Sequence, residues 1–317
     1  MMMRALSLAL AFSITGLAAC GGKDEAKNPS DVAEASLEDA FALLPASPVA
    51  VGTVDARAYF GSKTFGADLT KIVEQYLPIG QEAGFQASRD VDRVTFGSYS
   101  YAGVDVAAVL IGKFDAAKIK TAAQQHTPTK NGGMLVASQY AGRDVYTVNN
   151  VGFTILSPTR AIAGTESGIR RVLERIQDKR VKRDVPKWML DTLETPGASA
   201  AVAVDFVTTP MPPETARQIP VAYLKDAKQG RALWQFKDQA VQLSATLTYA
   251  DAQTATTASG QVKQSTSYLK YASLIGVKVQ DVDVKADNAD VQVQLTVDDQ
   301  SLRTALQLGA SFLGSGK

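Results

Sequence analysis

Two stretches of this chain carry the same succession of elements, and this repetition limits the possible folds more than any other feature. The first stretch starts with a short helical segment, Leu37–Pro45, followed by an apolar strand, Val49–Asp55. The second starts with Trp188–Pro196 and continues with the apolar run Ala200–Asp205. In each stretch a proline ends the helix and an aspartate ends the strand, so the same local rules apply twice.

The order of elements continues in parallel. The matching segments are a hairpin over 93–111 and one over 232–248, a helix over 117–125 and one over 266–274, a hairpin over 144–156 and one over 281–297, and an amphipathic helix over 168–177 and one over 301–312. Asn and Asp at the second pair of turns tolerate the positive φ of tight hairpins. The first stretch is longer near Ser157–Arg160, where we expect an added strand or loop.

These patterns predict an α+β fold of two tandem pseudo-repeated domains, each a mostly antiparallel sheet with packed helices. A chance alternation of helices and strands would give the same pattern without a structural repeat, so this alternative stays open. We expect the first domain over residues 36–177 and the second over 187–317, each close to the usual domain size.

A basic segment, residues 178–186, separates the two domains and ends at Pro186. Its lysines and arginines permit two interpretations. One is a patch for anionic lipid or another polyanion. The other, which we favour, is a solvated linker whose two aspartates partly neutralise a short cluster.

The N-terminal 19 residues have the organisation of a secretory signal peptide. Met1–Arg4 carries one positive charge, an apolar run extends from Ala5 to about Ile14, and small residues follow. The run is shorter than the roughly 20 apolar residues needed to span a bilayer. Residues 1–19 are therefore expected to direct export and to be removed.

Leu17, Ala18 and Ala19 precede Cys20, the only cysteine in the chain. This sequence resembles the lipobox of bacterial lipoproteins, and the resemblance covers residues 1–22. It implies that diacylglycerol is joined to the Cys20 sulfur, that cleavage follows Ala19, and that a further acyl chain such as palmitate joins the new amino terminus. Two or three chains anchor a protein stably. The alternative is an ordinary signal peptide and a free thiol.

The resemblance also implies a location in the cell. Gly21, rather than aspartate, follows Cys20, which favours the outer membrane over inner-membrane retention. Residues 20–35 are polar and poor in apolar side chains, as expected of a disordered tether. We therefore expect an exported protein, bound to the cell envelope through its lipid at Cys20.

Composition excludes several classes of function. The net charge of +1 gives no global field to recruit nucleic acid. A single cysteine rules out an internal disulfide, and no later apolar stretch is long enough for a transmembrane helix. His126 is the only histidine, too few for a zinc site and without the partners of a hydrolase triad.

Other candidate sites are weak. Gly61–Thr64 lacks the earlier glycine of a phosphate-binding loop, and Gly164–Gly168 is better explained as a helix cap than as a nucleophile elbow. Calcium would need clustered carboxylates, for which the candidates are Asp90 with Asp92, Asp281 with Asp283, and Asp287 with Asp290. The default is solvated turn carboxylates.

Asp55 and Asp205 end equivalent strands, so they would share a proton if a pseudo-twofold axis brought them together. Capping of the following segments is the simpler explanation. We predict no catalytic, metal or cofactor-binding residue, and hence no enzyme. The favoured function is binding or scaffolding of an envelope protein. The alternatives are a carrier of lipid or another hydrophobic ligand, for which some aromatic residues would line a groove, and a carboxylate-dependent hydrolase.

Overall fold

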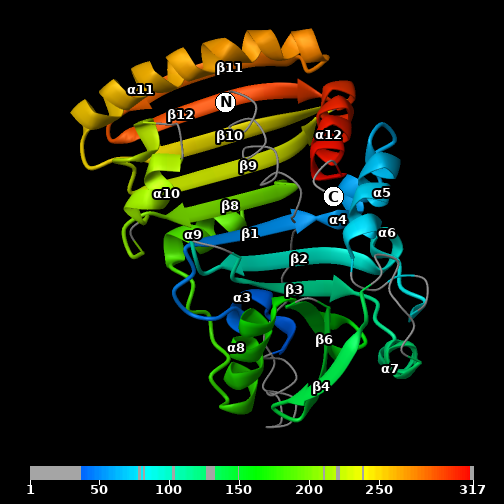
Figure 1. Ribbon diagram of the computed structural model, residues 1–317. Helices are drawn as coiled ribbons and strands as arrows, with labels where there is room; N and C mark the ends of the chain where they lie inside the picture. The colour runs from blue at the N-terminus through cyan, green and yellow to red at the C-terminus, as the bar shows by residue number, and fades with distance from the viewer. Residues whose placement is uncertain are drawn as a thin grey trace.

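The computed structural model describes residues 37–77, 80, 83–101, 104–125, 133–148, 150–209, 211–218, 222–237 and 239–314 (Figure 1). The strands within these residues are β1 (Ala50–Asp55), β2 (Val91–Ser98), β3 (Val106–Gly112), β4 (Val136–Tyr140), β5 (Arg143–Val148), β6 (Val151–Ser157), β7 (Arg160–Thr165), β8 (Ala200–Asp205), β9 (Gln229–Lys237), β10 (Ala240–Thr248), β11 (Val279–Asp287) and β12 (Asp290–Asp298).

These strands form one 12-stranded sheet in the order β11-β12-β10-β9-β8-β1-β2-β3-β7-β6-β5-β4. Every neighbouring pair is antiparallel. The predicted α+β class with a mostly antiparallel sheet is confirmed. We expected a sheet in each half, and the structure joins the halves in one sheet because β1 pairs with β8.

The α-helices are α3 (Ala40–Leu43), α4 (Ala56–Phe60), α5 (Gly66–Tyr76), α6 (Ala87–Asp90), α7 (Ala116–Gln124), α8 (Glu166–Gln177), α9 (Lys187–Leu193), α10 (Pro213–Gln218), α11 (Ala252–Thr266) and α12 (Asp299–Gly314). Two 3₁₀-helices, η2 (Ala222–Leu224) and η3 (Ser267–Ile275), complete the described elements. In the part of the chain that the structure describes, no helix has the length and apolar character needed to cross a membrane.

The first half of the sheet is covered on both faces. On one face, Val51, Val109 and Ile162 pack against buried side chains of α3, α8 and α9. On the other face, Val54 and Phe153 belong to a core completed by α4 through α7. Burial on both faces explains why β1 reads as a continuous apolar run rather than as an alternating one.

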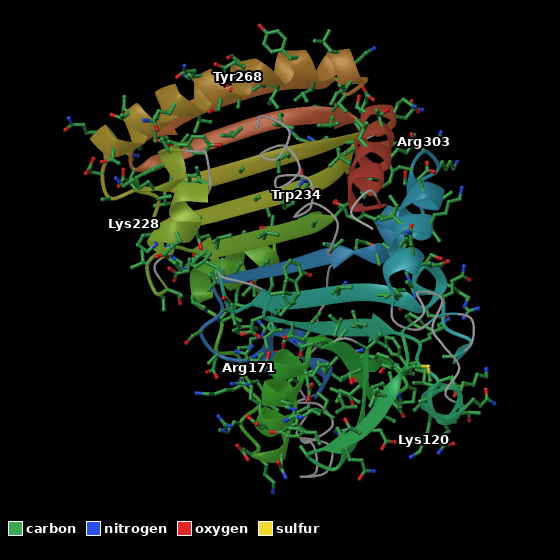
Figure 2. All side chains as sticks on the ribbon, in the orientation of Figure 1. Lys120, Arg171, Lys228, Trp234, Tyr268 and Arg303 are labelled. Atoms are coloured by element: carbon green, nitrogen blue, oxygen red, sulfur yellow. The ribbon has the colours of Figure 1, made fainter. Side chains whose placement is uncertain are left out.

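An apolar row crosses the second face. Leu295, Leu243 and Trp234 lie directly opposite one another on β12, β10 and β9, and Ala200 and Val54 continue the row on β8 and β1. Leu295, Leu243 and Trp234 are only half-buried. Figure 2 shows Trp234 near the middle of this face. The opposite face of β10 and β12 carries Gln, Ser and Thr, as is typical of a solvated face.

Two helices border this row. α11 runs along β11 and β12, and it packs its small buried residues Ala255, Ala258 and Val262 on Val291 (Figure 1). α12 lies across the other end of the strands and reaches α5 of the first half. There Arg303 Nε donates to Asp68 Oδ2 at 2.6 Å.

Several expected elements are present where the sequence indicated them. The hairpin over 93–111 is β2 and β3, the helix over 117–125 is α7, and the last amphipathic helix is α12. Two outcomes differ from what we expected. Residues 252–266 form α11, which we did not expect, and the helix expected at 266–274 is the 3₁₀-helix η3.

The strand β7 begins at Arg160, near the position where we expected an added strand or loop. It lies between β3 and β6. The hairpin expected over 144–156 is therefore built by β5 and β6, and neither strand pairs with β3. In the second half, β12 pairs with β10 directly.

Candidate functional site

The residues that carry the lipoprotein resemblance lie outside the described residues. They are Leu17, Ala18, Ala19 and Cys20, together with the tether over 20–35. The same holds for His126. The predictions made for these positions therefore stay predictions.

Asp55 and Asp205 do not form a pair. They lie at opposite ends of β1 and β8, because these strands are antiparallel. Asp55 Oδ1 accepts from the backbone N of Ala58 at 2.6 Å and caps α4. Asp205 Oδ1 accepts from the backbone N of Val207 and Thr208 at 2.7 and 3.0 Å. Each carboxylate stabilises its own following segment, so a shared proton between them is excluded.

Among the other candidate carboxylates, Asp90, Asp92 and Asp290 are held by local partners. Asp92 pairs with Arg57 at 2.5 Å, and Asp290 accepts from the Thr248 hydroxyl at 2.6 Å. The hydrogen bond from Arg89 and the one from the backbone of Gln86 hold the pKa of Asp90 below its usual value, against the effect of burial. Among the described residues, no group of three or more His, Cys, Asp or Glu side chains could hold a metal ion.

The two glycine-containing motifs have structural roles. Gly61 ends α4, and Ser62 Oγ accepts from the backbone of Thr64 and Phe65 in the turn before α5. Thr165 Oγ1 accepts from the backbone N of Gly168 at 3.2 Å, which caps α8. The predicted cap at this position is confirmed.

The linker over 178–186 is closely paired. Arg180 binds Asp178 at 2.7 Å, and Lys182 binds Asp184 at 3.1 Å. Arg183 binds Asp39 and Glu194 at 2.6 and 2.8 Å, and so joins the linker to both halves. This neutralisation favours the structural interpretation of the basic cluster over a polyanion patch.

Several aromatic residues on and near the strands are packing residues. Tyr146 stacks on Phe153 with a centroid distance of 5.2 Å inside the core. The Tyr101 hydroxyl donates to the Asp205 carbonyl at 2.7 Å, and burial raises its pKa above its ordinary value. Burial also raises the pKa of Tyr59 to about 12. A phenol in this state is no ready nucleophile near neutral pH.

An exposed apolar surface lies at the edge of the sheet, within the part of the chain that the structure describes. It consists of Tyr268, Tyr271, Leu274 and Ile275 on η3 and Val282 on β11, and we call it the η3–β11 surface. Leu274 is 82% exposed. Figure 2 shows Tyr268 at this outer edge. Isolated exposed apolar residues are normal, but a cluster of them marks an interaction site more often than chance.

The geometry of η3 explains why these side chains gather. A 3₁₀-helix has three residues per turn, so residues three apart lie in one row. Tyr268, Tyr271 and Leu274 follow this spacing, and the two tyrosine rings are 6.5 Å apart. Gly276, at φ 82°, ends the helix and leads the chain into β11.

An open groove of about 570 Å³ adjoins this surface, between α11, η3 and β11. Leu269, Val279, Val282 and Val284 supply its apolar lining, and Lys263 stands at its rim. Sequence reasoning missed this site. The only available signal was the spacing of three between Tyr268, Tyr271 and Leu274, which an α-helical interpretation obscures.

Comparison with known proteins bears on the fold alone. No family model and no curated protein matches the chain. Among solved structures, crystal form I of TP0453 matches with a TM-score of 0.51 at 10% identity, over 86% of this chain and 97% of that one. Crystal form IV of TP0453 matches with a TM-score of 0.50 at 9% identity, over 88% and 98%. The chain therefore shares its overall fold with TP0453, across nearly the whole of that protein.

Proposed function

We propose that this chain is a lipid-anchored, non-enzymatic protein of the cell envelope that binds or scaffolds a partner protein through the η3–β11 surface. The observation that carries the proposal is the exposed row of Tyr268, Tyr271 and Leu274 on η3. Exposed tyrosines supply a large contact area at low entropic cost, and aromatic residues are enriched at interfaces. The local roles found for the candidate carboxylates also favour binding over hydrolysis.

Site-specific photocrosslinking in intact cells tests this role. A photoreactive residue at Leu274 is expected to give a discrete crosslinked product. That product should disappear when Tyr271→Asp is added, because a carboxylate in the row would be desolvated on binding.

Val104 is the matched control position. It is 77% exposed but lies in the loop between β2 and β3. Crosslinks of the same pattern from Val104 and Leu274, or none from Leu274, would contradict the proposed role of the surface.

The lipid anchor is part of the proposal and has its own test. The lipobox Leu17–Cys20 supports it. Cys20→Ala should abolish labelling by radioactive palmitate and leave the leader uncleaved. Density fractionation of the unaltered protein should place it with the outer membrane. Normal labelling of the variant would refute the anchor.

A hydrophobic-ligand carrier is the second candidate, and the groove beside η3 favours it. Small-molecule sites are concave, mostly apolar and furnished with a few polar groups. The groove is concave and combines an apolar lining from Leu269 and the valines of β11 with the polar residues Lys263, Thr266, Ser267 and Asp283. Mass spectrometry of the native protein would reveal a co-purified ligand.

We also propose that the two halves are structural repeats related by a pseudo-twofold axis at the β1–β8 pair. The pairing supports it: Gly52 faces Val202, while Ala50 faces Val204 and Val54 faces Ala200. Adding 150 to each β1 number gives the equivalent β8 residue, so the register is symmetric about Gly52 and Val202.

Hydrogen bonds and strand order support the same axis. Asp55 N donates to the Ser199 carbonyl at 2.7 Å, and Asp205 N donates to the Val49 carbonyl at 2.8 Å. From the centre outwards, β1-β2-β3-β7-β6 corresponds to β8-β9-β10-β12-β11. This matches the hairpin of β6 and β7, rather than that of β5 and β6, to β11 and β12. An experimental structure in which α8 and α12 do not overlay after superposition of these strands would refute the repeat.

A further inference from the structure

The groove bounded by α11, η3 and β11 has the dimensions of a small-ligand site. Its volume of about 570 Å³ lies within the usual range for such sites. Val279, Val282 and Val284 line it from the strand, and Leu269 lines it from η3. Burial of apolar ligand surface against these four side chains would be favourable.

The edge strand itself argues against an added β-strand of a partner as the occupant of the groove. A partner strand would need a regular ladder along β11. The register of β11 shifts between Gln280 and Asp283, and Asp281 has a φ of 51°. Such a bulge interrupts pairing and protects an edge from strand addition.

Two charged residues, Lys263 and Asp283, line the groove. Asp283 is neutralised by Lys285, whose Nζ lies 2.5 Å from its Oδ2. Lys263 also lines the groove, and it makes no ion pair with any residue that the structure describes. Because Asp283 is paired with Lys285, Lys263 is the lining charge that remains available to an anionic head group.

We propose that this groove binds a single acyl chain with an anionic head group, as in a free fatty acid, with the chain along the valines of β11 and the head group beside Lys263. This inference rests on the second function proposed above. It goes further by naming the ligand class, its orientation and the residue that selects its charge.

Photoaffinity labelling of the native, lipid-anchored protein tests the inference. Washed envelope membranes, in which no new acylation occurs, are incubated with palmitate carrying a diazirine on the chain. Hexadecanol with the same diazirine is the neutral comparison. The label is expected to map to residues 263–284, and palmitate should label more strongly than hexadecanol.

Three variants locate the interaction. Lys263→Gln should lower palmitate labelling about two- to fivefold, as expected for an exposed charge pair, and leave hexadecanol labelling unchanged. Val282→Asp should lower both, because it places a charge on the apolar lining. Lys228→Gln, at an exposed site away from the groove (Figure 2), should change neither.

Three results would overturn the inference. They are label spread over the whole surface, undiminished labelling of Val282→Asp, and stronger labelling by a phosphatidylglycerol with the same diazirine. Circular dichroism of each variant confirms that it is folded. The crosslink from Leu274 reports partner binding separately, so its loss would remove the partner-protein proposal without deciding the ligand.

Discussion

Arg175 of α8 connects the basic segment 178–186 to α3. Its replacement gives the sharpest prediction for the free energy of unfolding. Its side chain is 6% exposed. Nη1 donates to Asp184 Oδ2 at 2.9 Å, and Nη2 donates to the carbonyls of Lys182 and Ala42 at 2.8 and 3.2 Å. The basic linker is thus fixed by a buried guanidinium that lies outside it.

The expected cost of Arg175→Ala follows from these bonds. A hydrogen bond to a charged group contributes about 2 kcal/mol, and each bond to a carbonyl contributes about 1 kcal/mol. The loss of about 4 kcal/mol agrees with the 3–5 kcal/mol typical of breaking a buried pair. In Arg175→Ala, Lys182 still contacts Asp184, so this carboxylate keeps a partner and the loss of stability stays below the upper end of that range.

Urea denaturation measures this cost. With an m-value of about 3 kcal/mol per M, the midpoint should fall by more than 1 M. Arg175→Met keeps the packing of the stem and should lose nearly as much stability. Arg180→Ala is the matched control, since its side chain is 58% exposed and should contribute less than about 1 kcal/mol. Equal effects of the Arg175 and Arg180 variants would refute the reasoning.

Three further predictions concern single sites. The pKa of Asp90 is lowered in the folded state, so the ionised carboxylate stabilises the fold above a pH of about 4, and this stabilisation is lost as the pH falls through the folded pKa. The free energy of unfolding of Asp90→Asn should therefore fall less steeply with acid than that of the unaltered protein. Gly168→Ala would place the new Cβ 2.2 Å from a backbone oxygen of β3, and thermal unfolding should show a loss of about 1–3 kcal/mol. Gly260→Ala on α11 is the control: its Cβ would meet nothing within 4 Å, so the variant should be more stable by up to about 1 kcal/mol. Asp55→Ala and Asp205→Ala should each cost about 1 kcal/mol of unfolding free energy, because each removes the acceptor that stabilises the following segment. In urea denaturation the double variant should show the sum of the two losses, because the two sites lie at opposite ends of their strands. Strong coupling between the two losses would contradict this independence.

Local signals predicted the elements whose determinants are local. α8 begins at its predicted cap Thr165 and buries Ile169, Val172 and Leu173 on one face, as its period of 3.6 requires. The strands β1 and β8, which both end in aspartate, were also predicted from the sequence, because a continuous apolar run and a capping side chain act within a few residues.

α11 escaped prediction because its buried face is made of small residues. Ala255, Ala258 and Ser259 allow the helix to lie close to the sheet, but they contribute little to a hydrophobic pattern. The sequence pattern also did not distinguish the 3₁₀-helix η3 from an α-helix. The three residues per turn of the 3₁₀-helix align Tyr268 with Tyr271 and Leu274.

The sequence alone determined the α+β class and the positions of most local elements, and it predicts an export signal and a lipid anchor at Cys20. The tertiary structure decided that β1 and β8 join the halves in one sheet, that β7 inserts beside β3, and that η3 and β11 leave an apolar surface exposed. The physical reason is the range of the interactions. Caps and periodic faces depend on residues within a turn or two, whereas strand partners and exposed surfaces depend on which distant segments bury one another.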